Sequence, residues 1–179
     1  MPITRDELAT KLREQWKKYM VTEGNDIIEI SVSSKNFTGP TAEHFMNIIL
    51  KVEEEGRYLK IIAPGLYSLK SINDRLTMAA LHRKLLQICW ETKLVQFEFN
   101  NEELEIRGIV EIAIEDGTLT ALQLQRAVQT LHEVVDHYHP DITEIISGKS
   151  DAQAMAITQE KQESYSKIFN SRLDQALRR

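Results

Sequence analysis

The sequence lacks most of the features that announce a particular chemistry. Cys89 is its only cysteine, so no intrachain disulfide can form and we expect a cytoplasmic protein. The seven glycines are scattered, and none belongs to a Gly-rich loop of the kind that cradles phosphate groups. No Ser-His-Asp set can be assigned from the order of the residues. We therefore expect neither a bound cofactor nor catalytic residues.

Basic charge and long apolar runs are also scarce. The chain carries 22 Lys and Arg against 27 Asp and Glu, a net charge of −5. A nucleic-acid partner usually requires a basic surface, so we expect none. No apolar run is long enough to cross a bilayer, and the first residues, MPITRDEL, lack the apolar core of a signal peptide. These absences favour a protein without a membrane partner.

The clearest pattern present is the stretch from Val95 to Pro140. It begins with two runs, 95–99 and 104–114, in which apolar and polar residues alternate as in half-buried strands. Asn100 and Asn101 lie between the runs and are typical of a hairpin turn. Thr120 and Gln123 then have the spacing of a capping box, which opens a helix. We expect this helix to end at Pro140, because proline disfavours helix at the preceding residue.

The N-terminal half has the same kinds of pattern. Thr4 and Glu7 form a second capping box, which predicts a helix to about Met20. Alternation predicts strands at 28–32, 46–52 and 58–63, the last ended by Pro64-Gly65. Asn73 or Asp74 caps a helix that reaches about Trp90. Its residues are apolar on most sides, so we expect it to be the buried, central helix.

This order predicts an α+β fold, α-β-β-β-α-β-β-α, over residues 1–147. Its five-stranded antiparallel sheet would be covered by helices on one face. The opposite face would be polar with an apolar minority, and such a minority can form a docking surface. The candidates for protein contact on this face are Ile49, Tyr58, Ile62 and Ile109.

Residues 148–179 differ in composition from the rest. A segment rich in Gln, Ser, Ala and Glu precedes an apolar stripe at helical spacing. We expect a polar linker and an amphipathic helix here. Its apolar residues could pack on their own domain or on a second copy. The contact candidates are Tyr165, Phe169, Leu173 and Leu177.

One cluster of residues resembles a metal-binding motif. His132, Glu133 and Asp136 have the spacing of a metalloprotease helix, and His137 and His139 add nitrogen donors. Asp136 replaces the second histidine of that motif and no third ligand is evident, so a charged helix end is the preferred interpretation. Cys89 lies in the most apolar helix and is interpreted as an inert hydrophobic residue. The run Glu53-Glu54-Glu55 is interpreted as a solvated turn.

The 95–140 stretch resembles the YbjN-like family over roughly residues 4–145. The residues that carry the resemblance are Asp116, Gly117, Leu119, Thr120, Leu131, Val135, Asp136, Tyr138 and Pro140. The resemblance implies a bacterial protein with a fold like that of type III secretion chaperones. Those are small acidic proteins, usually dimeric, that bind an extended segment of another protein. No catalytic residues come with it.

The sequence thus predicts a non-enzymatic protein-binding or chaperone-like adaptor that forms a homodimer. An alternative is a small-ligand or metal-dependent enzyme that uses the His132–His139 cluster. A third hypothesis is a transcription-linked regulator that acts through protein contacts, since the net charge of −5 disfavours direct binding to DNA.

Overall fold

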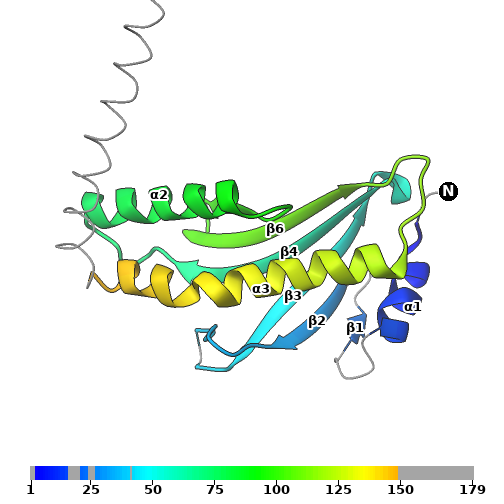
Figure 1. Ribbon diagram of the computed structural model, residues 1–179, viewed down its shortest axis with the longest axis horizontal. Helices are drawn as coiled ribbons and strands as arrows, with labels where there is room; N and C mark the ends of the chain where they lie inside the picture. The colour runs from blue at the N-terminus through cyan, green and yellow to red at the C-terminus, as the bar shows by residue number, and fades with distance from the viewer. Residues whose placement is uncertain (1–2, 16–20, 24–26, 41, 149–179) are drawn as a thin grey trace, which may run out of the picture.

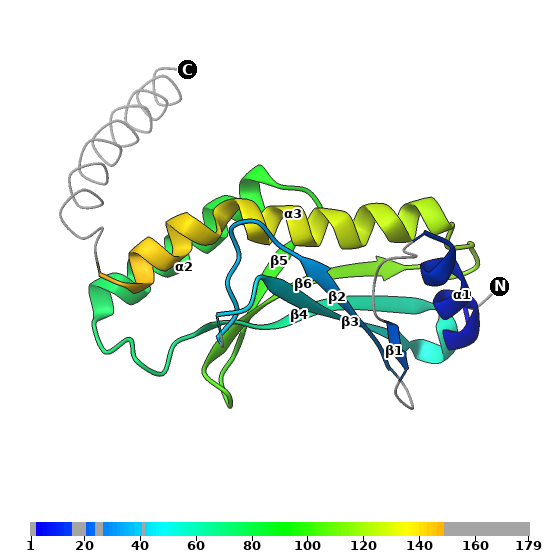
Figure 2. The ribbon, with the colours of Figure 1, turned by 90° about the horizontal axis from the view of Figure 1, so that it is seen from below.

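The computed structural model describes residues 3–15, 21–23, 27–40 and 42–148, and it confirms the α+β class. The helices are α1 (Arg5–Gln15), the single 3₁₀ turn η1 (Glu54–Gly56), α2 (Arg75–Glu91) and α3 (Ala121–Ile146). The strands are β1 (Val21–Glu23), β2 (Ile27–Ser33), β3 (Phe45–Glu53), β4 (Tyr58–Ser68), β5 (Gln96–Asn100) and β6 (Glu105–Ala113). The helices lie on one side of the sheet (Figures 1 and 2).

The sheet has the order β1-β2-β3-β4-β6-β5, and every neighbouring pair is antiparallel. The five predicted strands are all present. A further edge strand, the three-residue β1, pairs with β2. It occupies residues just beyond the predicted end of the first helix, and the last described residue of α1 is Gln15. Since β5 pairs only with β6 among the described residues, it forms the other edge.

Local hydrogen bonds account for where the three helices begin. The Thr4 hydroxyl accepts from the Glu7 backbone N–H (3.2 Å), and the Glu7 carboxylate accepts from the Thr4 backbone N–H (2.9 Å). Thr120 and Gln123 make the same reciprocal pair at the start of α3. Asp74 accepts from the Thr77 backbone N–H at 2.7 Å. Each cap satisfies amides that the first helical turn leaves free, as predicted.

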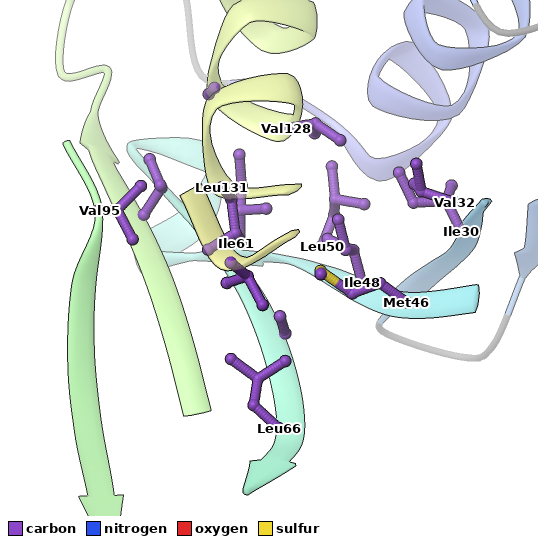
Figure 3. Close-up of a cluster of buried hydrophobic side chains, with 14 of the residues drawn as sticks. Ile30, Val32, Met46, Ile48, Leu50, Ile61, Leu66, Val95, Val128 and Leu131 are labelled. Atoms are coloured by element: carbon purple, nitrogen blue, oxygen red, sulfur yellow. The ribbon is translucent and has the colours of Figure 1, made fainter. Parts of the chain in front are cut away.

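Helix α3 covers the middle of the sheet and builds the core with it. Its residues Val128 and Leu131 point toward Leu50 and Ile61 of the central strands, and all four are at most 1% exposed (Figure 3). A Cβ atom on Gly108 of β6 would lie 3.0 Å from Leu131 Cδ1. The helix can therefore approach this strand closely because residue 108 has no side chain.

Two proline predictions were wrong. Strand β4 continues through Pro64 and Gly65 to Ser68, with an irregularity in its pairing to β6 between Ala63 and Tyr67. A bulge accommodates a residue that has no backbone N–H to donate. Likewise α3 continues through Pro140 to Ile146. Tertiary packing of the last turns, in which Ile142 is fully buried, outweighs the hydrogen bond that proline removes.

The prediction of a buried, central α2 was also wrong. One face of α2 is buried through Leu81, Leu85 and Ile88, but the opposite face carries exposed leucine and tryptophan side chains. The central helix is α3. Helix α2 lies beside it at the outer edge of the molecule (Figure 1). A helix that is apolar on most sides need not be buried on all of them, since a second apolar face can be exposed and available to bind another element.

Candidate protein-contact face

The side of the sheet away from the helices carries an apolar row, hereafter the open-face row. It consists of Ile49 on β3, Ile62 on β4 and Ile109 on β6. Ile49 lies directly opposite Ile62, and Ile62 directly opposite Ile109. Because side chains alternate between the faces of a strand, these three project from the face that the helices leave uncovered. The sequence prediction that they share one face is confirmed by this register.

The members of the row differ in exposure. Ile49 and Ile62 are half-buried, as is Tyr58 four residues before Ile62 on β4. Ile109 has no exposed surface, although it does not belong to the main core cluster. Neighbouring side chains on this face therefore cover Ile109, and a partner cannot contact it directly. The accessible contact candidates on the sheet are Ile49, Tyr58 and Ile62.

Paired charges surround the row. Lys60 Nζ lies 3.0 Å from Glu111 Oε1 and 3.7 Å from Glu98 Oε1. Arg107 donates from Nε (2.8 Å) and Nη2 (2.5 Å) to Glu98 Oε2. Lys51 pairs with Glu53 at 2.8 Å on the neighbouring strand. These charges satisfy one another across the strands, so a partner need not neutralise them before it contacts the row.

The ionisation of this face follows from the same network. Lys60 beside Glu111 holds the pKa of that carboxyl below its usual value, against the opposing effect of burial, and the Tyr58 hydroxyl adds a hydrogen bond. Burial raises the pKa of Tyr58, and its hydrogen bond to Glu111 acts in the same direction. At neutral pH Glu111 is therefore an anion and Tyr58 a neutral hydroxyl, so the rim offers both an acceptor and a hydroxyl to a partner.

The cluster around His132, Asp136 and His139, which resembles a metal-binding motif in the sequence, has a structural role. Asp136 Oδ1 accepts hydrogen bonds from the backbone N–H groups of Lys35 (3.0 Å), Asn36 (2.8 Å) and Phe37 (2.8 Å). Burial raises the pKa of this carboxyl, but the three backbone bonds and nearby His132 outweigh it and the net pKa is lowered. One carboxylate thus holds the loop between β2 and β3 against α3.

Two histidines extend this anchor, and with Asp136 they form what we name the loop clamp. His132 Nε2 lies 3.0 Å from Ser34 Oγ, and His139 Nε2 accepts from the Thr38 backbone N–H at 3.3 Å. Because Nε2 of His139 accepts, the proton of its neutral ring is on Nδ1, which lies 3.3 Å from the Tyr67 hydroxyl. Burial lowers the pKa of both histidines.

The clamp corrects the interpretation of this cluster as a charged helix end. His139 is buried between the rings of Phe37 and Tyr67, and α3 continues for two turns beyond it. Positions 132, 136 and 139 share one helix face, which is the arrangement that metal ligands and loop anchors both require. Within the described part of the chain, no three His, Cys, Asp or Glu side chains are placed to hold a metal. Cys89 is half-buried.

Sequence reasoning missed an exposed apolar face on α2, hereafter the α2 stripe. It consists of Leu76 (59% exposed), Leu86 (71%) and Trp90 (89%), with exposed Ala79 and Arg83 between them. The positions 76, 79, 83, 86 and 90 alternate in steps of three and four, the spacing of a helix-packing seam. The sequence contains this spacing, but the buried face of α2 is equally apolar. The pattern alone therefore does not show which of the two faces is exposed.

The other contact candidates of the sequence, Tyr165, Phe169, Leu173 and Leu177, lie outside the described residues. The structure therefore places the sheet candidates alone. None of the helices in the described part of the chain is both long and apolar enough to cross a membrane.

Comparison with known proteins supports the fold. The crystal structure of YbjN from E. coli, a protein proposed to be a transcription regulator, aligns with a TM-score of 0.52 at 11% identity, covering 78% of this chain and 93% of that one. The HopA1–SchA chaperone–effector complex contains a chain that aligns with a TM-score of 0.44 at 14% identity, covering 75% of this chain and 95% of that one.

The expected resemblance to YbjN is thereby confirmed at the level of fold, and a chaperone–effector complex is also among the structural neighbours. No protein-family model matches the sequence. No curated protein matches it either. At such low identity the likeness concerns the arrangement of helices and strands, so functional arguments must come from the surfaces of this chain.

Proposed function

We propose that the protein is a non-enzymatic, chaperone-like adaptor that binds another protein on the open face of its sheet. The observation that carries the proposal is the open-face row, whose accessible members Ile49 and Ile62 lie opposite each other on adjacent strands, with none of the described helices over them (Figures 1 and 2). An apolar group with a polar rim is the usual composition of a protein-binding surface. The structural neighbours support a protein-binding role at the level of fold.

The charges of this face indicate the chemistry of the partner. Five carboxylates lie on it, those of Glu29, Glu53, Glu98, Glu105 and Glu111, against three cations, Lys51, Lys60 and Arg107. Carboxylates thus outnumber cations, in line with the net charge of −5. We propose a partner segment that places apolar side chains on Ile49 and Ile62 and has basic residues at its flanks. Such complementary charge favours rapid association more than tight binding.

A retention experiment on the full chain tests this proposal. The immobilised wild-type protein, the Ile49→Asp variant and the Leu122→Asp variant are compared for the proteins that they retain from the native cell extract. Leu122 is the matched control, because it is an exposed leucine on α3, away from the open face. We expect the same protein to be retained by the wild type and by Leu122→Asp and to be lost with Ile49→Asp, because a charge in the row opposes apolar contact.

Two results would overturn the proposal. One is a retained protein whose recovery is equal with Ile49→Asp, since that protein does not use the row. The other is that the wild type retains no protein even when the extract is in large excess over the immobilised chain. A far-ultraviolet circular dichroism spectrum identical to that of the wild type shows that each variant is folded, and Tyr58→Ala provides a second, milder change on the same face.

We also propose that the adaptor is a homodimer in a bacterial cytoplasm, joined at the β5 edge. Strand β5 ends the described sheet and carries exposed Phe99, with exposed Leu94 just before it. An unprotected edge with apolar side chains pairs readily with a second strand. Light scattering should give twice the mass of the chain for the wild type and one chain mass for Phe99→Lys, whereas a wild-type monomer would refute the dimer.

A further inference from the structure

Among the described residues, the α2 stripe is an exposed apolar feature that the adaptor proposal leaves unused. Leu76, Leu86 and Trp90 are each more than half exposed, while the other face of α2 is packed on the domain. The stripe extends from the first turn of α2 to its last, roughly 20 Å at the rise of an α-helix. Its seam spacing suits a second helix better than an extended peptide. The stripe therefore suits an occupant with a helical apolar face.

The path of the chain brings one candidate to this place. Lys84 of α2 pairs with Asp141 of α3 (2.6 Å), and Glu91 of α2 accepts from the Tyr138 hydroxyl (3.1 Å). The two helices are thus antiparallel, and the C-terminal end of α3 lies beside the N-terminal end of α2, as Figures 1 and 2 both show. The described residues end at Gly148, two residues after α3, and the stripe begins with Leu76 in the first turn of α2.

The sequence after this point has the complementary pattern. Residues 149–164 are rich in Gln, Ser, Ala and Glu, and larger apolar residues then recur at helical spacing: Tyr165, Ile168, Phe169, Leu173 and Leu177. We propose that residues 165–177 form a helix that docks along the α2 stripe of the same chain. Phe169 and Leu173 would cover Leu86 and Trp90 there. The C-terminal segment is then a built-in cover of α2, separate from the open face that receives the partner.

Tethering explains why this occupant is preferred to a second copy. A linker the length of residues 149–164 spans up to roughly 50 Å when extended, which is more than the length of the stripe. It holds the docking helix at an effective concentration on the order of millimolar. A second copy that is free in solution would have to reach a similar concentration to compete at this face. The proposed dimer edge at β5 is not required for the docking.

Trp90 provides a direct readout in the full chain. Replacing the other tryptophan, Trp16→Phe, leaves Trp90 as the single fluorescent indole. We expect its emission to be blue-shifted and poorly quenched by acrylamide, unchanged when the protein is diluted. Adding Phe169→Asp should shift the emission to that of free indole and raise the quenching constant several-fold. Ser171→Asp, on the opposite side of the predicted helix, introduces the same charge and should leave Trp90 shielded.

A mixing experiment distinguishes the chain's own segment from that of a second copy. Protein with Trp16→Phe and Phe169→Asp, in which Trp90 reports, is mixed with protein carrying Trp16→Phe and Trp90→Phe, which is silent but has an intact C-terminal segment. We expect Trp90 to remain exposed after mixing. Shielding on mixing would assign the stripe to a second copy and overturn the proposal, as would an indole in the full chain as exposed as free tryptophan. Neither readout depends on partner retention or on dimer mass.

Discussion

At the scale of single residues, the loop clamp shows how one side chain can organise a segment far away in sequence. Asp136 receives three backbone N–H groups from residues about a hundred positions earlier. These amides belong to a loop and have no strand partner to replace the carboxylate. Removing one acceptor therefore leaves several donors unsatisfied at once, which is costlier than losing a single exposed bond.

We expect Asp136→Ala to lower the free energy of unfolding by about 2–3 kcal/mol, the value for hydrogen bonds to a charged group. Urea denaturation followed by circular dichroism measures this. Asp141→Ala is the control on the same helix, since it removes an exposed ion pair with Lys84 and should cost less than about 1 kcal/mol. Equal losses for the two variants would contradict the anchoring role of Asp136.

The histidines of the clamp make stability depend on pH. Burial lowers the pKa of His132 and of His139 from the ordinary 6.5. As pH falls below about 6.5, the unfolded chain binds protons before the folded one does, so the free energy of unfolding decreases. The decrease continues down to the folded pKa values. Asp136, whose pKa is lowered from 3.8, stabilises the fold above that value and loses this contribution progressively as pH falls from there through its lower folded pKa.

The slope of stability against pH between 7 and 5 should be smaller in His139→Gln, since an amide still accepts from Thr38 but does not titrate. Urea midpoints at a series of pH values measure the slope. His137→Gln is the control, because it replaces an exposed imidazole two residues away. A slope unchanged by His139→Gln would show that His139 does not take part in the acid sensitivity.

At the scale of elements, helix starts were predictable and helix ends were not. A capping box is local, so Thr4-Glu7 and Thr120-Gln123 determine their helices without help from the rest of the chain. The end of α3 depends instead on Ile142, which is buried by residues remote in sequence. The same reason explains α2: its spacing revealed a helix, but which of two apolar faces is buried depends on α3 and β5.

Helix α3 continues past Pro140, where the sequence predicted its end, and this leads to a prediction about its stability. Pro140 is exposed and cannot donate the backbone bond that residue 140 of a regular helix gives to residue 136. Pro140→Ala should raise the free energy of unfolding by about 1–2 kcal/mol, because the gain in helix propensity exceeds the added entropy of the unfolded chain. Pro64→Ala, at the bulge of β4, should give no such gain. A less stable Pro140→Ala would mean that the fold requires the proline there.

At the scale of the whole molecule, the two faces of the sheet have different roles. The face under the helices forms the core, and the open face carries the row proposed for partner binding. Alternation in the sequence assigned residues to these faces correctly, as the registers of β3, β4 and β6 show. It did not reveal that Ile109 would be fully covered, since exposure depends on how the side chains of its own and the neighbouring strands lie over it.

Two adjacent isoleucines of β4 test this separation. Ile61 faces the core and has no exposed surface, whereas Ile62 is half-buried on the open face. Ile61→Ala should lower the free energy of unfolding by about 2–5 kcal/mol, the range for a fully buried side chain. Ile62→Ala should cost less than that, because the side chain of Ile62 is only partly buried.

The effects on binding should be reversed. A folded Ile61→Ala protein should retain the partner captured by the wild type, measured at a temperature well below its midpoint of unfolding. Ile62→Ala should weaken that retention, because it removes half of the contact pair that Ile49 and Ile62 form across β3 and β4. If the two variants affected stability and retention in parallel, the open face would be an ordinary part of the packing, and the surface for partner binding would have to lie elsewhere.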